Sequence, residues 1–471
     1  MLGWEYPPHI SGGLGTACEG LTTALAPLDL DIQFVVPQLY GVERAPHMRL
    51  VSPALRPRGV PVTPSGEPIQ RSPAASGGPL AVEPPTASPA DVEPNVERRD
   101  GMFVQTVRFP ALLSPYMTPE EYRTWARAMG DDLDEDGVSL HFESLPEDDH
   151  DGGALREEAG KGAHYGRNLF GEVLRFADRV AAWAVHQRPD IVHAHDWMTF
   201  PAATRVARAL NVPLVVHIHS LEQDRSGHGP NPTIVAIESA GVRSATRVIA
   251  VSHYTARMIH EQHNVALDRI SVVHNGVYAN RTVSAYQAET RKQGPVVLFL
   301  GRITYQKGPE YFVEAAAKVL QKLPEARFMM AGSGDMLPQI QARVKELGIE
   351  AAFEFPGFVR GPEVERLFSV ADAYVMPSVS EPFGIAALEA MSYETPVILS
   401  RQSGASEVLR HALKVDFWDV DRLAAQIVAV LKYPELRSSI VEMAREEVRR
   451  VHWEAAAAKV KQVYERAFAD V

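Results

Sequence analysis

The sequence predicts an α/β protein with two doubly wound domains, each a parallel sheet covered by helices. The chain has 471 residues, which is too long for one hydrophobic core and long enough for two. Strand-like and helix-like segments alternate in two separate series, as is typical of parallel strands joined by helical crossovers. A polar stretch without periodicity, residues 277–295, separates the series, and we interpret it as the linker.

The first series predicts an N-terminal Rossmann-like domain over residues 1–284. It opens with a glycine loop, ISGGLG, which precedes a helical pattern at 19–28 and a strand-like run at 31–37. Order then resumes with a helix, a strand, a helix and two further strands that have a helix between them. The two helices before the last pair of strands span residues 168–187 and 198–210. The three strands span residues 189–196, 212–220 and 246–252.

Two segments of this first part lack the composition of a packed core. Residues 52–97 carry prolines at short intervals among small and polar residues, so they cannot bury enough apolar area to offset their ordering entropy. Residues 131–151 are strongly acidic and include Asp132-Leu133-Asp134, which we interpret as part of a solvated loop. We expect both insertions to be disordered.

The second series predicts a Rossmann-like domain over residues 285–450, followed by a closing helix at 451–471. The expected strands are short apolar runs, each followed by a helix-like segment. They lie at residues 296–300, 326–331, 352–359, 373–378 and 396–400. Ligands of such sheets bind beyond the carboxyl ends of the strands, so residues directly after strands are the first candidates for function.

Composition excludes several classes of protein. The formal net charge is −12, which argues against nucleic acid or an anionic membrane as the main partner. No run of about 18 apolar residues is present, and the opening MLGWEYPP lacks the features of a secretory signal. The one cysteine, Cys18, fits a reducing compartment. We therefore expect a cytoplasmic protein without a transmembrane segment, and the sequence leaves its oligomeric state open.

Two cations follow the first strand of the second domain. Gly301-Arg302 comes directly after the strand, and Lys307 lies just before a helix. Arginine offers a fork to phosphate oxygens and lysine a mobile point charge, so the pair predicts an anion site. Gly332, after the next strand, is assigned to the same site. The alternative is a pair of surface cations without a ligand.

The segment SEPFGIAALEA places two acids eight residues apart in an apolar run. We expect Pro382 at the first position of a helix, which leaves the N–H groups of Phe383, Gly384 and Ile385 free for an anion or a sugar. Glu381 stands at the mouth of this turn and Glu389 about two helical turns further on, where a carboxylate suits a ribose diol. The alternative is a structural role, with Glu389 paired to an arginine and Glu381 at a helix end.

The first domain has histidines two apart on two predicted strands, in PDIVHAHD and VVHIHS. Because residues two apart share a strand face, His193 with His195 and His217 with His219 can each chelate zinc, with Asp196 as a further ligand. The alternative is a metal-free pocket in which Asp196 and a histidine bind sugar hydroxyls. The loop Ser11–Gly15 precedes a helix and can present N–H groups to phosphate, although many glycine loops are only tight turns.

Together these motifs resemble the retaining glycosyltransferases of the two-domain GT-B fold, closest to bacterial and archaeal glycogen and starch synthases and related group 1 glycosyltransferases. The matching segments cover most of the chain outside the insertions. They are WEYPPHISGGLGTACEGL, DIVHAHDW, HSLEQDRSG, GRITYQKG, EPFGIAALE and VHWEAAAAKVKQVYERAF. The resemblance implies two domains facing across a cleft, the first on the acceptor side and the second binding the nucleotide sugar. It also implies that the closing helix packs back on the first domain.

The resemblance implies roles for the second-domain residues. Arg302 and Lys307 would neutralise the departing diphosphate, which makes a metal unnecessary. Glu381 would contact the donor sugar near the reacting centre, and Glu389 would hold the nucleotide ribose. Backbone N–H groups at 383–385 would bind sugar or phosphate oxygens.

In the first domain the resemblance places Asp196 and His219 in the sugar pocket, with the carbonyl of His219 steadying positive charge on the anomeric carbon. Gly12 and Gly13 would bind the nucleotide sugar. The chain departs from the synthase pattern at Ile10, where a basic residue is usual, and this favours a looser relative. Because relatives carry more apolar strand before GWEYPP, we expect Met1 to be an internal methionine of that strand.

The function implied is a metal-independent retaining hexosyltransferase. It would use no cofactor and would move glucose from ADP-glucose or UDP-glucose to an α-glucan in a glycogen synthase-like reaction. The main alternative is a hexosyltransferase of the same fold that uses another nucleotide sugar for a surface polysaccharide, a glycolipid or a small osmolyte. A nucleotide-sugar epimerase and a metallohydrolase built on the histidine pairs are further alternatives.

Overall fold

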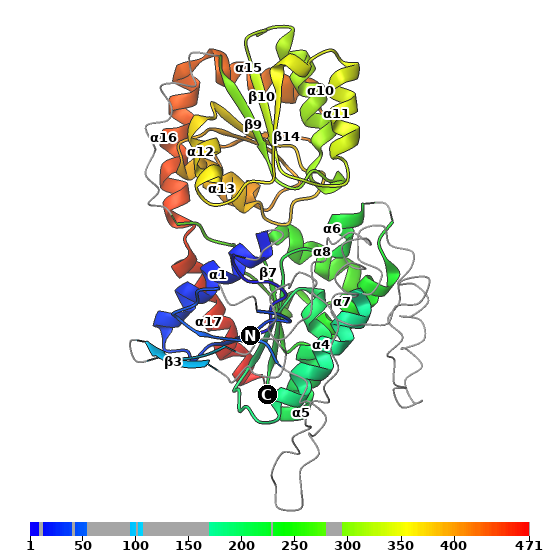
Figure 1. Cartoon of the computed structure of the whole chain (residues 1–471), viewed down its shortest axis with the longest axis vertical. Helices are drawn as coiled ribbons and strands as arrows, with labels where there is room; N and C mark the ends of the chain where they lie inside the picture. Colours follow the sequence, from blue (N-terminus) through cyan, green and yellow to red (C-terminus); the bar gives the residue numbers. More distant parts are fainter. Residues whose placement is uncertain are drawn as a thin grey trace, which may run out of the picture.

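The structure is a computed structural model, and its description rests on defined parts of the chain. The described residues are 1–8, 13–39, 43–53, 95–99, 102–106, 169–227, 229–278 and 294–470. They form two α/β bodies, one above the other in Figure 1, with the N-terminal half below and the C-terminal half above. The prediction of two doubly wound domains is confirmed, because both central sheets are parallel and have helices between their strands.

The first domain is built on parallel strands whose carboxyl ends carry the predicted histidines. Its four-stranded sheet has the order β5-β6-β7-β8. These strands are β5 (Val192–His195), β6 (Leu214–Ile218), β7 (Arg247–Ala250) and β8 (Ile270–Val272). Leu2 bridges β5 to β1 (Gln33–Val35), which pairs in parallel with β2 (Arg49–Val51). The N-terminal segment therefore joins the two sets of strands into one layer.

Helices cover both faces of this layer. The helices of the first domain are α1 (Gly13–Leu25), α4 (Leu169–Ala184), α5 (Phe200–Leu210), α6 (Glu222–Ser226), α7 (Pro232–Ser244) and α8 (His253–His263). Alternate residues along β5 and β6 point to opposite faces. One set packs in a core with α4 and α5. The other faces α1 and the final helix, which share a second core.

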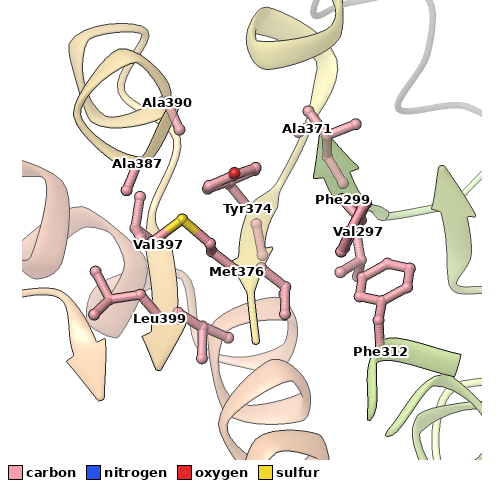
Figure 2. Close-up of a cluster of buried hydrophobic side chains, with 14 of the residues drawn as sticks. Val297, Phe299, Phe312, Ala371, Tyr374, Met376, Ala387, Ala390, Val397 and Leu399 are labelled. Carbon is pink, nitrogen blue, oxygen red and sulfur yellow. The ribbon is translucent and has the colours of Figure 1, made fainter. Parts of the chain in front are cut away.

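The second domain has a six-stranded parallel sheet of order β11-β10-β9-β12-β13-β14. Its strands are β9 (Val296–Leu300), β10 (Arg327–Ala331), β11 (Phe353–Gly357), β12 (Ala373–Met376), β13 (Val397–Ser400) and β14 (Leu413–Val415). Its helices are α10 (Pro309–Leu320), α11 (Leu337–Glu346), α12 (Pro362–Val370), α13 (Ile385–Ser392), α14 (Ala405–Val408), α15 (Val420–Lys432) and α16 (Pro434–Arg450). Figure 2 shows Tyr374 and Met376 of β12 between side chains of β9 and β13.

The final helix, α17 (Trp453–Ala469), belongs to the first domain. It packs against α1 and β6, and a Cβ added at Gly20 of α1 would lie 2.2 Å from the Trp453 ring. The chain thus crosses between the domains a second time after α16, as Figure 1 shows on the left. The two crossings touch, because the N–H of Val277 donates to the carbonyl of Val451 at 3.0 Å.

The predicted insertions fall almost wholly outside the described residues, as does all of 131–151. The structure describes only the two ends of 52–97, and the expected disorder of the segment stays a prediction. Ser52 is buried and donates to the carbonyl of Pro37 at 2.8 Å. Residues 95–97 belong to β3 (Asn95–Arg99), which pairs antiparallel with β4 (Met102–Thr106). Asp100-Gly101, between them in the sequence, is a hairpin signal that the proline count obscured.

No helix within the described parts of the chain is both long and apolar enough to cross a membrane.

Candidate active site

The cations of the second domain lie at the carboxyl end of β9. Arg302 is half-buried and its Nη2 donates to Oε1 of Gln306 at 2.8 Å. Gln306 is buried, and its backbone carbonyl accepts the N–H groups of Val379 and Ser380 at 3.0 and 3.4 Å. Arg302 is therefore connected through Gln306 to the segment that carries Glu381.

Lys307 and Glu381, 74 positions apart in the sequence, form an ion pair. Lys307 Nζ lies 2.5 Å from Glu381 Oε2, and the Ser378 hydroxyl donates to the same oxygen at 3.2 Å. The two side chains are 21% and 7% exposed, so the pair is accessible mainly on the lysine side. Glu381 is also held by its backbone, whose N–H donates to Gln402 and whose carbonyl accepts from Gly404, both at 2.9 Å. The structure thus brings Lys307 and Glu381 together, with the backbone of Glu381 held by two hydrogen bonds.

The helix after Glu381 begins later than predicted. We expected Pro382 at its first position, but α13 begins at Ile385 with Gly384 as N-cap. Gly384 has φ +98°, which interrupts the helical path, and a Cβ there would lie 2.8 Å from Met376 Cε. The N–H groups that lack intrahelical acceptors therefore begin at Gly384 and Ile385. Phe383 is buried, and its carbonyl accepts from the N–H of Ala405.

Glu389 lies in the middle of α13 and is half-buried. Burial raises the pKa of the Tyr374 hydroxyl well above its ordinary value, and the charges of Glu381 and Glu389 raise it further. The same hydroxyl donates to the carbonyl of Leu300 at 3.2 Å, directly before Gly301. Both carboxylates therefore act on a hydroxyl that lies at the end of β9.

Gly301 and Gly332 have different surroundings although both follow strands. A Cβ at Gly301 would meet nothing within 4 Å, which leaves open space beside Arg302. A Cβ at Gly332 would lie 1.8 Å from the carbonyl oxygen of Gly301, and Gly332 has φ +146°. Gly332 is therefore required by the close approach of two backbones, and its predicted contact with a nucleotide sugar stays a prediction.

Asp196 ties the end of β5 to the end of β6. Its Oδ1 accepts the N–H groups of His219 at 2.7 Å and Ser220 at 3.4 Å. Burial raises the pKa of Asp196 to about 6. The residue has φ 59° and ψ 167°, a conformation that side-chain-bearing residues rarely adopt and that is often found at functional sites.

His219 is a neutral group in this structure. Burial lowers its pKa to about 3, and its Nε2 lies 3.0 Å from Nδ1 of His195. A neutral imidazole binds sugar hydroxyls through hydrogen bonds and adds no charge. The structure brings Asp196 and His219 together, and their contact with a sugar stays a prediction.

The glycine loop is only partly described. Gly12 lies outside the described residues. Gly13, expected in a loop before the helix, is the first residue of α1, is exposed, and would have open space around a Cβ. The N–H of Gly15 donates to Oε1 of Glu5 at 3.1 Å, so a carboxylate already occupies one of the first donors of this helix.

Contacts between the domains involve residues that the sequence did not single out. The buried carboxylate of Asp224 accepts from the Ser380 hydroxyl at 2.5 Å, and burial raises the pKa of Asp224 to about 6. The Ser380 oxygen also lies 2.8 Å from the hydroxyl of Tyr254. Asp224 belongs to the quoted HSLEQDRSG segment, but its partner is 156 positions away, and no local pattern reveals such a pair. These bonds join the loop of Glu381 to α6 and α8.

Glu407 makes a second link of this kind. Its carboxylate accepts the N–H groups of His253 and Tyr254 at 2.9 and 2.8 Å, and it pairs with His274 Nε2 at 2.9 Å. A residue of the second domain thus caps α8 of the first domain, where the helix dipole favours negative charge.

The histidine pairs form one cluster and not the two separate chelating pairs of the zinc alternative. His195 is the direct cross-strand neighbour of His217, and His193 precedes it on the same face. Among the described residues, no group that could hold a metal ion includes Asp196, whose carboxylate accepts the N–H groups of His219 and Ser220. The zinc alternative that included Asp196 is therefore wrong in its ligand set.

The cluster predicts loss of stability in acid. Burial lowers the pKa of His193, His195 and His217 well below 6.5, so the unfolded chain binds more protons than the folded chain below that pH. Buried acids have the opposite effect, since Asp196, Asp224 and Glu238, with pKa values of about 6, 6 and 8, are protonated more in the folded state. Burial also lowers the pKa of His219 to about 3 and that of His263 to about 4, which adds to the effect of the cluster. The histidines outnumber these acids, so we expect the Tm to fall as the pH drops from 6.5 to 4.5. Circular-dichroism melts would measure it, and a constant Tm over this range would contradict the prediction.

Comparison with known families gives a consistent result for both domains. Residues 282–447 match the family described as glycosyl transferases group 1, and residues 124–281 match glycosyltransferase family 4. An uncharacterized glycosyltransferase of Methanocaldococcus jannaschii is 32% identical over 293 residues, which are 58% of this chain and 75% of the relative.

Two further relatives have more specific names. A glycogen synthase of Mycobacterium tuberculosis is 30% identical over 286 residues, covering 59% of this chain and 69% of that protein. A D-inositol 3-phosphate glycosyltransferase of Thermobispora bispora is 29% identical over 304 residues, covering 59% and 71%.

Solved structures agree on the fold. A sucrose-phosphate synthase from Thermosynechococcus elongatus has a TM-score of 0.57 at 24% identity, over 67% of this chain and 83% of that one. Anabaena HepE, solved with UDP and glucose, has a TM-score of 0.56 at 19% identity, over 62% and 82%.

Proposed function

Because this chain belongs to the group 1 glycosyltransferases of the GT-B type, we propose that it transfers glucose from ADP-glucose or UDP-glucose to an α-glucan, with retention of the anomeric configuration and without a metal in the reaction. The observation that carries the proposal is the arrangement at the end of β9. There Arg302 and the Lys307–Glu381 pair lie near the N-terminus of α13. This combination of fixed cations and free amides suits a diphosphate leaving group.

The proposed reaction breaks the bond between the anomeric carbon and the diphosphate oxygen. The electron pair leaves with the nucleoside diphosphate, whose charge Arg302 and Lys307 stabilise. A hydroxyl of the acceptor attacks from the face that the leaving group vacates, and its proton departs with the diphosphate. Asp196 and His219, whose strand ends are tied together, bind the hydroxyls of the transferred sugar.

The Lys307–Glu381 pair also has a positioning role in this proposal. An ion pair of 2.5 Å fixes the ammonium before the donor arrives, so little reorganisation is needed when charge develops on the diphosphate. Glu381, held by Gln402 and Gly404 through its backbone, then faces the donor sugar. The loop of Glu381 is bonded to the first domain through Ser380, and such contacts favour a closed site that excludes water.

A second acceptor class has support of its own. One relative acts on D-inositol 3-phosphate by name, and Ile10 replaces the basic residue usual in glycogen synthases. The alternative is therefore a hexosyltransferase that uses a small phosphorylated or polysaccharide acceptor. Both candidates share the donor chemistry described above.

The test is a donor and acceptor screen. The protein is incubated with a panel of nucleotide sugars, and released nucleoside diphosphate is measured with glycogen, with inositol phosphate and without acceptor. We expect release that depends on glycogen and on ADP-glucose or UDP-glucose. Release only with inositol phosphate would support the alternative, and no release with any donor would contradict both.

Glu389 provides a prediction about donor binding. A ribose contact exists before and during the reaction alike, so Glu389→Ala should raise the donor KM by about tenfold with little change in kcat, as expected when one charge-assisted hydrogen bond is lost. Steady-state kinetics with varied donor would measure both constants. Glu394→Ala, an exposed acid just after the same helix, is the matched control. A large fall in kcat at constant KM would contradict the ribose assignment.

A further inference from the structure

The histidines of the first domain form a stacked cluster inside the protein core. His193 and His195 of β5 stack with ring centroids 4.4 Å apart, and His217 of β6 lies 5.4 and 5.3 Å from them. All three are at most 1% exposed. Their side chains lie on the face of the sheet that is covered by α1 and α17. Imidazoles in such a place are expected to satisfy both ring nitrogens.

Several of these nitrogens have no protein partner. Among the described residues, no hydrogen bond reaches Nε2 of His193, Nε2 of His195 or either nitrogen of His217. Buried polar atoms without partners cost free energy unless water or an ion binds them. The ligand nitrogens of the three rings lie within 4.8 Å of one another, which makes the three residues a candidate group for one bound ion.

The opposite nitrogens of two rings are already fixed. Nδ1 of His193 lies 2.6 Å from the hydroxyl of Tyr464 in α17, and Nδ1 of His195 lies 3.0 Å from Nε2 of His219. Histidines that bind metals usually have their other nitrogen held in this way, which sets the tautomer and the ring orientation. Among the described residues, both Nε2 atoms are left buried and without a hydrogen-bond partner.

We propose that His193, His195 and His217 bind a transition-metal ion, with Zn²⁺ as the ion that they suit best. Neutral imidazole is a preferred zinc ligand, and the ion takes such nitrogens at about 2.0–2.1 Å in the plane of the ring. The rings therefore have to turn out of their stacked planes to meet the ion. The Sγ of Cys18 lies within 4.8 Å of the ligand nitrogens of His195 and His219, which places a potential anionic sulfur beside the site.

The ion has a structural role that is separate from the proposed transfer reaction. It joins β5 to β6, and the residues beyond those strand ends are Asp196 and His219. With the ion on Nε2 of His195, the proton of that ring is on Nδ1 and is donated to Nε2 of His219. The proton of His219 is then on its own Nδ1. The metal thereby selects the tautomer of a residue assigned to the sugar pocket.

Metal content tests the proposal directly. The full chain, produced without a metal-affinity tag, is unfolded in denaturant with chelator, refolded with or without Zn²⁺, desalted and measured by mass spectrometry for metals. We expect about one Zn²⁺ per wild-type chain and less than a tenth of that in His193→Gln and His217→Gln. His263→Gln is the matched control, since His263 is equally buried and its Nε2 also makes no hydrogen bond among the described residues, yet it lies in α8 and in no candidate metal group. It should retain the metal.

Two measurements keep the proposal open to refutation if the histidine variants fold poorly. Tyr464→Phe leaves all three ligands in place and removes only the hydroxyl on His193, so Zn²⁺ affinity should fall about 10- to 100-fold. In addition, Zn²⁺ should raise the Tm of the metal-free wild type but not that of His217→Gln. Wild-type protein that holds no more Zn²⁺ than His217→Gln, or a Tm indifferent to Zn²⁺, would overturn the proposal.

Discussion

Lys307→Ala is expected to lower kcat by on the order of 10²–10³, the loss typical when a preorganised group that stabilises developing charge is removed. The ammonium lies 2.5 Å from Glu381, at the end of β9 beside Arg302. Its removal leaves the diphosphate with one cation in place of two and leaves Glu381 without its ion-pair partner. Initial rates of nucleoside diphosphate release at saturating donor would measure the effect, and Arg302→Ala should behave similarly.

Two control variants separate the effect of Lys307→Ala on turnover from its effect on stability. Lys322→Ala removes an exposed lysine of the same domain and should leave kcat unchanged. The double variant Lys307→Ala/Glu381→Gln removes the uncompensated charge and should recover Tm relative to Lys307→Ala while turnover stays low. Wild-type turnover in Lys307→Ala would remove this lysine from the leaving-group role.

Asp196→Ala is expected to reduce both stability and turnover. The N–H groups of His219 and Ser220 lose a charged acceptor, at a cost of about 1.5–3 kcal/mol in the free energy of unfolding. The end of β6 then shifts, and misplacement of about 1 Å in a sugar pocket can cost about 10²-fold in rate. Chemical denaturation and steady-state kinetics would measure the two effects.

Asp196→Asn distinguishes the negative charge of the carboxylate from its structural role as a hydrogen-bond acceptor. Asparagine tolerates positive φ and keeps an oxygen acceptor, so most of the stability should return. Turnover should stay low if the carboxylate itself binds the sugar. Because burial raises the pKa of Asp196 to about 6, the wild-type rate should also fall below that pH as the carboxylate gains a proton. Full activity of Asp196→Asn would limit this residue to a structural role. Asp178→Ala, at an exposed surface ion pair, is the control.

Much of the fold was predictable because its signals are local. Runs such as 296–300 and 397–400 are short, apolar and followed by helices, which is sufficient to indicate buried parallel strands. Arg302 and Lys307 were singled out because residues beyond strand ends carry ligands in such sheets, and Glu381 because it stands at a helix start. Periodicity was enough for the strands, and the position of these residues at strand and helix ends was enough to select them.

Other features depend on geometry that sequence spacing does not contain. The start of α13 was placed at Pro382, because proline suits a first turn, whereas the positive φ of Gly384 delays the helix to Ile385. The histidine pairs were visible as i and i+2 patterns, but their merger into one cluster requires β5 and β6 to be neighbours in register. The bond between Asp224 and Ser380 depends on the relative position of two domains.

The two chain crossings at Val277 and Val451 have a mechanical consequence. A single connection would let the domains swivel freely, whereas two connections joined by a hydrogen bond define an axis about which bending is easy and twisting is hindered. Opening of the molecule should therefore be a hinge motion about this axis, which moves Arg302 of the second domain away from His219 of the first. Deleting the chain from Trp453 onward would remove α17. The domains would then be joined by one connection, and the apolar surface of α1 would be exposed.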